Sequence, residues 1–148
     1  MTNETMRKFG FPDTLVREYR HWVVLVRPAQ VTLGSLVLCA KSEATSFGAL
    51  EPDAYSELAE IIPAIESTLR SFRDYERINY LMLMMVDPNV HFHVIPRYSE
   101  PRVFNNTAFL DTGWPGLPDL KAAPALDSTA LGQLRYILAE KFGLTILK

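Results

Sequence analysis

His91 and His93, which are separated by one residue, are the residues of this sequence whose type and spacing are best suited to a catalytic or binding role. In an extended strand successive side chains point to opposite faces, so both imidazoles are expected on one face together with Asn89. Same-face neighbours start roughly 6 to 7 Å apart, which lets their side chains converge on one tetrahedral anion. The pattern therefore indicates a site suited to phosphate chemistry.

Two other interpretations of this pattern stay open. Alternating polar and apolar residues describe any half-buried strand, and a histidine on its wet face often has no chemical role. A His-x-His pair can also bind zinc, which usually needs three or four protein ligands. No histidine follows His93, and the single cysteine, Cys39, lies between apolar residues and is predicted to be a small core residue. No metal site is predicted, since its remaining ligands would have to be carboxylates recruited from elsewhere.

Length and composition limit the class of protein. A chain of 148 residues fits a single domain, 1–148, and nearly half of it is apolar, which argues against disorder. The formal charge of −2 without a basic run gives no electrostatic case for a nucleic-acid polymer as partner. The N-terminus lacks the apolar stretch of a secretory signal, and the longest apolar run, 80–86, is too short to cross a membrane. We expect a soluble cytoplasmic protein with no membrane partner.

The elements around the histidines predict an antiparallel sheet. Ranges 14–19, 22–26 and 33–39 are rich in β-branched and aromatic residues and indicate a small meander. Residues 78–86 predict a further strand, which a short turn at Asp87-Pro88 joins to the histidine strand as a hairpin.

Two helices complete the prediction. Apolar residues recur at helical spacing from Pro52 to Phe72, with Pro63 expected to kink the helix. Asp127 is predicted to cap a last helix over 128–142, and Gly143 to end it. The segment 99–126 is predicted to hold little regular structure. The expected class is α+β, an antiparallel sheet with one long helix packed on it and a C-terminal helix.

These residues resemble a known family. The run Asn89-Val90-His91-Phe92-His93-Val94-Ile95-Pro96-Arg97 is similar to the motif His-x-His-x-His followed by apolar residues and Pro-Arg, with Asn89 in place of the first histidine. The order of hairpin, helix and strand before it also matches, so that the resemblance covers roughly 14–97. The chain resembles the histidine-triad (HIT) family of nucleotide hydrolases and transferases.

The resemblance implies roles for the two histidines. His91 matches the nucleophile, which attacks the phosphorus of a nucleotide to give a covalent nucleotidyl-histidine. An imidazole is substantially neutral near pH 7, so a lone pair is available if the other ring nitrogen is held as a donor. His93 matches the last triad histidine, which would donate to a phosphate or bridging oxygen as the bond breaks.

Five further residues are implied to bind the substrate. Asn89 can support the nucleophile by hydrogen bonding but carries no positive charge. Arg97 could add to the field around the phosphate, and Arg27 stands about where the family commonly holds the ribose, although a cation suits a phosphate better. Ser35 takes the place of a histidine that often follows glycine, and Asn79 lies upstream of the loop where Asp87-Pro88 replaces the family's phosphate-binding residues.

The expected function is a HIT-like nucleotide hydrolase or nucleotidyl transferase without a cofactor, which cleaves a phosphoanhydride or phosphoramidate bond through a covalent His91 intermediate. The alternative is a degenerate HIT-like dimer that binds a nucleotide or another anion without turnover, and a third option is a metal-dependent hydrolase. The expected partners are a small nucleotide or phosphate ester and, by resemblance, a second copy of the chain in a homodimer.

Overall fold

A five-stranded antiparallel sheet forms the centre of the protein in the computed structural model, which describes residues 2–121 and 123–146. The meander predicted from the first part of the chain is confirmed, and the histidine strand pairs with its third strand. In spatial order the strands are β1 (Leu15–Glu18), β2 (Trp22–Val26), β3 (Leu36–Ala40), β5 (His91–Arg97) and β4 (Arg77–Leu81). The expected α+β class is confirmed.

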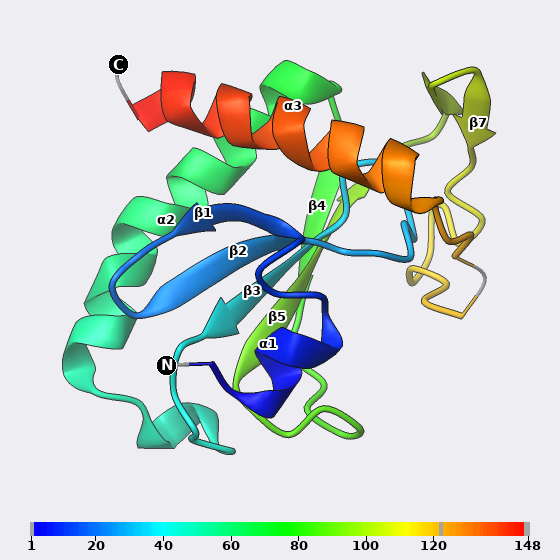
Figure 1. Cartoon of the computed structure of the whole chain (residues 1–148). Helices are drawn as coiled ribbons and strands as arrows, with labels where there is room; N and C mark the ends of the chain where they lie inside the picture. The colour runs from blue at the N-terminus through cyan, green and yellow to red at the C-terminus, as the bar shows by residue number, and fades with distance from the viewer. Residues whose placement is uncertain (1, 122, 147–148) are drawn as a thin grey trace.

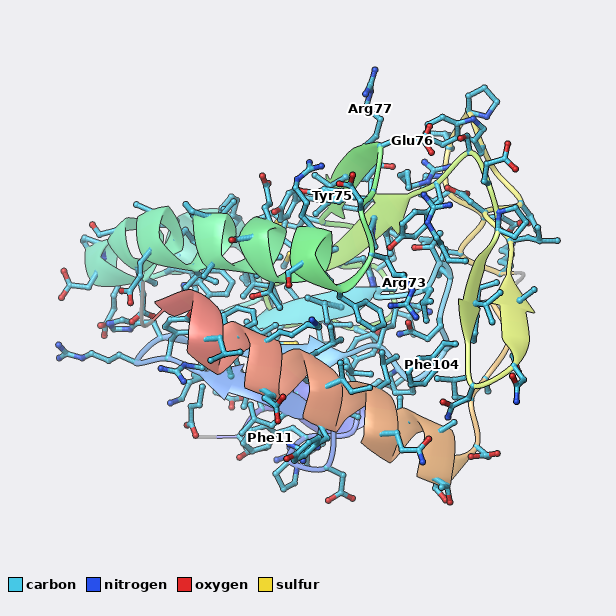
Figure 2. All side chains as sticks on the ribbon, turned by 90° about the horizontal axis from the view of Figure 1, so that it is seen from above. Phe11, Arg73, Tyr75, Glu76, Arg77 and Phe104 are labelled. Carbon is cyan, nitrogen blue, oxygen red and sulfur yellow. The ribbon has the colours of Figure 1, made fainter. Side chains whose placement is uncertain are left out.

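Two long helices, α2 (Pro52–Phe72) and α3 (Ser128–Ile146), cover one face of the sheet and lie side by side, as Figures 1 and 2 show. The apolar residues of α2 recur three and four positions apart, so that one stripe of the helix packs on the sheet. This main core combines the helices with alternate strand residues, among them Ile61, Ile65, Leu69, Leu134, Leu138, Trp22, Val24, Leu36, Leu38 and Val94. In the described part of the chain no helix is long and apolar enough to cross a membrane.

The opposite face of the sheet is covered in part by a short N-terminal helix, α1 (Glu4–Lys8), which lies beside β5 in Figure 1. A second, smaller core joins this segment to the strand residues that point away from α2 and α3: Met6, Phe9, Val23, Leu25, Val37 and Cys39. Every residue of β2 and β3 is therefore buried. Cys39 is fully buried, as predicted.

The strand predicted over 78–86 is shorter than expected. β4 ends at Leu81, and β4 and β5 pair as an antiparallel hairpin whose connection runs from 82 to 90 instead of a tight Asp87-Pro88 turn. Met84 has a positive φ of 52°, which takes the backbone out of the extended conformation. The side chains of Leu83, Met85 and Val86 are consequently exposed.

In the C-terminal part, the segment 99–126 holds little regular structure, as predicted, apart from one short hairpin, whereas the predicted end of the last helix is wrong. The segment 99–126 contains a hairpin, β6 (Arg102–Phe104) and β7 (Thr107–Phe109), which stands beside the main sheet in Figure 1. Its turn is made by Asn105 and Asn106, both with the positive φ that two-residue hairpin turns require. Helix α3 continues past Gly143 to Ile146, because Gly143 does not adopt the left-handed conformation of a helix-ending glycine.

Candidate functional site

His91 and His93 lie on the α1 side of β5, on one face, as their spacing predicts. The ring centroids are 5.1 Å apart and the ring planes meet at 82°. In the neighbouring strand His91 pairs with Cys39 and His93 with Val37, two residues of the smaller core. Both histidines are buried, with 1% and 5% of their surface exposed. The strand alternation thus brings both imidazoles together in a buried site.

The tautomer of His91 is set by a hydrogen bond to the backbone. Its Nδ1 atom lies 2.7 Å from the carbonyl oxygen of Asn89. Because a carbonyl oxygen only accepts, Nδ1 must carry the proton, and the lone pair of the neutral ring resides on Nε2. An imidazole held in this way is prepared to act as a nucleophile through Nε2.

His93 is held in its neutral form. Burial is the main cause that lowers the pKa of His93 to about 4; electrostatic interactions with Arg27 and His91 contribute to this lowering, and Asp87 opposes it. Its Nδ1 atom is buried without a hydrogen-bond partner among the described residues. Neutral His93 therefore lines the cavity with one ring nitrogen that makes no hydrogen bond among the described residues.

A cavity of about 330 Å³ opens on both histidines. Arg27 from the end of β2 and Lys8 from α1 bring positive charge to it, and Lys8 forms an ion pair of 2.9 Å with Asp87. Burial lowers the pKa of Arg27, but an arginine stays charged in proteins. The remaining wall is apolar, and the full lining is Lys8, Phe9, Arg27, Leu83, Met84, Met85, Val86, Asp87, His91, His93 and Leu120.

Phe9 covers the two histidines. The centroid of its ring lies 5.7 Å from that of each imidazole, with tilted packing on His91 and edge-to-face packing on His93. Phe9 itself is 8% exposed. The N-terminal segment therefore forms one wall of the cavity.

Arg97 and Asn79, both predicted to bind substrate, lie in a different part of the protein. The guanidinium of Arg97 donates from Nε and Nη2 to the two carboxylate oxygens of Asp111, at 2.7 and 3.0 Å, and from Nη1 to Asn79 Oδ1 at 2.8 Å. The side chains of Arg97 and Asp111 are 5% and 1% exposed. Arg97 and Asn79 border a cavity of about 620 Å³ between β4 and the segment 114–118. This network fixes Asp111, three residues before Trp114, to the end of β5.

Ser35 and Asn89 also point away from the histidine cavity. The Ser35 hydroxyl accepts from the Thr32 backbone N–H at 3.0 Å and donates to the Thr32 carbonyl at 2.8 Å, within a turn. The Asn89 side chain is bound to Thr5 and to the backbone of Glu43. Of the five residues predicted to bind substrate, Arg27 alone is among the lining residues.

Residues of the cavity that the sequence did not indicate come from the N-terminal segment and from the loop 83–87. A signal for the helix existed, because Asn3 followed by Glu4 is a typical N-terminal cap with an acidic first turn. Nothing in the local sequence indicates that Phe9 reaches His91, since the two are 82 positions apart. Leu120, in the long connection between β7 and α3, also lines the cavity.

The described residues hold no group of three or more histidine, cysteine, aspartate or glutamate side chains that could bind a metal ion. His91 and His93 are accompanied in their cavity by one carboxylate, Asp87, which is paired with Lys8. The chemistry of this donor set therefore favours an anion over a metal.

Comparison with known proteins identifies the fold. No protein-family model matches the sequence, and no curated protein matches it. Solved structures do match: a histidine triad protein from Sinorhizobium meliloti 1021 has a TM-score of 0.73 at 16% identity, covering 95% of this chain and 96% of that one. A histidine triad protein from Marinobacter aquaeolei VT8 has a TM-score of 0.72 at 16% identity, covering 97% and 96%. A third, from Bradyrhizobium japonicum, has a TM-score of 0.68 at 16% identity, covering 96% and 97%. The chain has the fold of the histidine triad proteins.

Proposed function

We propose that this protein, built on the histidine triad fold, is a nucleotide hydrolase or nucleotidyl transferase that works through a covalent intermediate on His91. The observation that carries the proposal is the hydrogen bond from His91 Nδ1 to the Asn89 carbonyl, which leaves Nε2 as the nucleophilic nitrogen. The substrate is a nucleotide with a phosphoanhydride or phosphoramidate bond, such as a dinucleoside polyphosphate.

In the first step His91 Nε2 donates its electron pair to the phosphorus, and a P–N bond forms. The bond between phosphorus and the leaving oxygen or nitrogen breaks, its electron pair departs with the leaving group, and a proton from the medium completes that group. Arg27 balances the charge that develops on the phosphoryl oxygens, and neutral His93 orients one of them by donating a ring N–H.

In the second step water or another acceptor attacks the phosphorus, and the acceptor loses its proton to the medium. The P–N bond breaks, and its electron pair returns to Nε2, which restores neutral His91. Water as acceptor gives hydrolysis, whereas a hydroxyl or phosphate of a second molecule gives transfer. The buried position of the imidazoles favours the reaction, because charge stabilisation is stronger where water is excluded.

Mass spectrometry of the intact protein tests this mechanism. The protein is incubated with dinucleoside polyphosphates and nucleoside phosphoramidates, and quenched without acid, since a P–N bond is labile to acid. We expect a mass increase equal to one nucleotidyl group, located on His91 and absent in His91→Gln. His21→Gln is the matched control, because His21 borders a different cavity. Turnover that is unchanged in His91→Gln would contradict the mechanism.

A second function, binding without turnover, is favoured by one observation. Phe9 lies against both imidazoles and leaves His91 1% exposed, so that in this conformation an attacking geometry requires Phe9 to move. Calorimetry separates the two functions. Nucleotide affinity that survives His91→Gln, without any product from the parent protein, would support binding alone.

The proposal includes a homodimer formed at the open edge of the sheet. β4 is the last strand in the order, and in the described structure it has a partner strand on one side only. The side chain of Arg77, at the start of this strand, extends away from the protein in Figure 2. Light scattering at micromolar concentration is expected to give twice the 16.8 kDa of one chain, and the mass of one chain would contradict the dimer.

A further inference from the structure

The helix α1 is fastened to the sheet at its first turn. Asn3 caps the helix by accepting from the Met6 backbone N–H at 2.9 Å. Its side-chain amide also donates to the carbonyl oxygens of Ala40 and Ser42, at 2.8 and 2.7 Å. A helix of five residues is too short to be stable alone, so its position depends on such contacts.

The second attachment is a reciprocal contact between Thr5 and Asn89. Asn89 Oδ1 accepts from the Thr5 backbone N–H at 3.2 Å and from the Thr5 hydroxyl at 3.1 Å. The same hydroxyl oxygen accepts from the Asn89 backbone N–H at 3.1 Å. The other end of the amide, Nδ2, donates to the Glu43 carbonyl at 3.1 Å. Thr5 and Asn89 are 1% and 4% exposed, so these groups would be costly to leave without partners.

The far end of α1 reaches the histidines. Lys8, its last residue, forms the ion pair with Asp87, and both line the cavity; Phe9 follows directly and packs on both imidazoles. Asn89 is two residues before His91, in the connection that leads into β5, so the residue that holds α1 is followed by the strand that carries the nucleophile. The attachment at Thr5 and the cover at Phe9 are four residues apart, about one helical turn.

We infer that Asn89 is a positioning residue that fixes α1 through Thr5, so that Phe9 and Lys8 form a wall of the cavity and control access to His91 and His93. The side chain at the first position of the motif thus acts on the site through the N-terminal segment and not through the ligand. Loss of the Thr5 contact frees α1 to move with Phe9, and the two imidazoles become accessible. The inference deepens the proposed function, in that it takes this cavity as the site of reaction.

Chemical modification of histidine tests the inference without any substrate. Diethyl pyrocarbonate acylates accessible neutral imidazoles, and mass spectrometry of peptides measures its rate separately at His21, His91 and His93 in the full chain at pH 7. We expect slow modification of His91 and His93 in the parent protein. In Asn89→Ala and Thr5→Val both rates should rise about tenfold or more, as expected when buried hydrogen bonds that keep a segment closed are lost.

Matched variants separate positioning from general destabilisation. Thr5→Ser keeps the hydroxyl and should retain the slow rates, whereas Thr5→Val has nearly the same shape as threonine and loses the hydroxyl. Phe9→Ala should raise the rates at His91 and His93 even with α1 attached. Phe47→Ala is its control, because Phe47 packs on Phe92, which faces the main core. His21 should react equally in all these proteins.

Two results would overturn the inference: unchanged rates at His91 and His93 in Thr5→Val, or an equal rise at all three histidines. Far-ultraviolet circular dichroism and urea unfolding show that each variant is folded. If Asn89→Ala does not fold, the pair Thr5→Val and Thr5→Ser decides the question. The two claims can fail separately. If the parent protein turned over no nucleotide, the proposed function would be contradicted, while fast modification of His91 and His93 in Thr5→Val would still support the positioning role of Asn89.

Discussion

The bond that orients His91 comes from the backbone of Asn89, while the side chain of Asn89 is directed to Thr5 and Glu43. One residue thus has two separate functions in the fold. Its carbonyl sets the tautomer of the nucleophile, which any residue at this position could do. Its amide fastens the N-terminal segment, which requires an acceptor and a donor at the same time.

This separation predicts the effect of restoring a histidine triad. Asn89→His should not increase turnover, because an imidazole cannot reproduce the contacts that the amide makes with both Thr5 and Glu43. We expect the variant to be less stable by about 1–3 kcal/mol, the cost of leaving buried polar groups unpaired. Urea unfolding and nucleotide turnover measure the two quantities. If Asn89→His turned nucleotides over faster and were as stable as the parent protein, the prediction would be contradicted. Asn89 would then differ from a triad histidine only in lacking its catalytic function.

Arg27 is predicted to govern the proton affinity of His93. Its charge is the second cause, after burial, of the low pKa of His93. Arg27→Gln should therefore raise the pKa of His93, but not to 6.5, because burial persists. The shift is measured by a nuclear magnetic resonance titration of the imidazole. The same variant should bind inorganic phosphate or a nucleotide more weakly, by about tenfold for a lost charge-assisted hydrogen bond. A pKa of His93 unchanged in Arg27→Gln would contradict the electrostatic coupling.

The buried histidine also predicts that stability falls in mild acid. His93 has a pKa of about 4 in the folded protein and an ordinary value of 6.5, so between these pH values the unfolded chain binds more protons. The contribution of His93 is therefore fully present above pH 6.5 and is lost as the pH falls towards 4. Between pH 7 and pH 5 the loss is about 2 kcal/mol in the free energy of unfolding. Urea titrations at both pH values measure it, and His93→Gln should reduce the difference.

The ion pair between Arg97 and Asp111 is predicted to be important for stability and not for nucleotide binding. Asp111→Ala leaves the Arg97 guanidinium buried with one side-chain partner, Asn79, and should cost about 3–5 kcal/mol. Asp74→Ala is the matched control, because Asp74 pairs with Arg70 on the surface and should cost about 0.5 kcal/mol or less. Thermal and urea unfolding give the comparison. Equal stability of the two variants would contradict a structural role for Asp111.

Local sequence was sufficient for the sheet, the long helix and the shared face of the histidines. The period of two in the histidine strand places His91 and His93 on one side whatever the rest of the chain does, and the helical spacing of Ile61, Ile65 and Leu69 defines the buried stripe of α2 in the same way. Propensity was misleading after Leu81, where β4 ends and the backbone leaves the extended conformation, with a positive φ at Met84.

Tertiary structure alone decided what surrounds the histidines. Asn89 binds Thr5, which is 84 positions away, and Arg97 binds Asp111, which is 14 positions away. Neither pairing produces a periodic pattern in the sequence. A polar residue can satisfy its hydrogen bonds with any partner that the fold brings near, so its type alone does not say whether it faces a ligand or another segment. For that reason the sequence could define the reactive pair, while only the packing of α1 against β5 determined that Asn89 is bound to the N-terminal segment and that Phe9 covers the site.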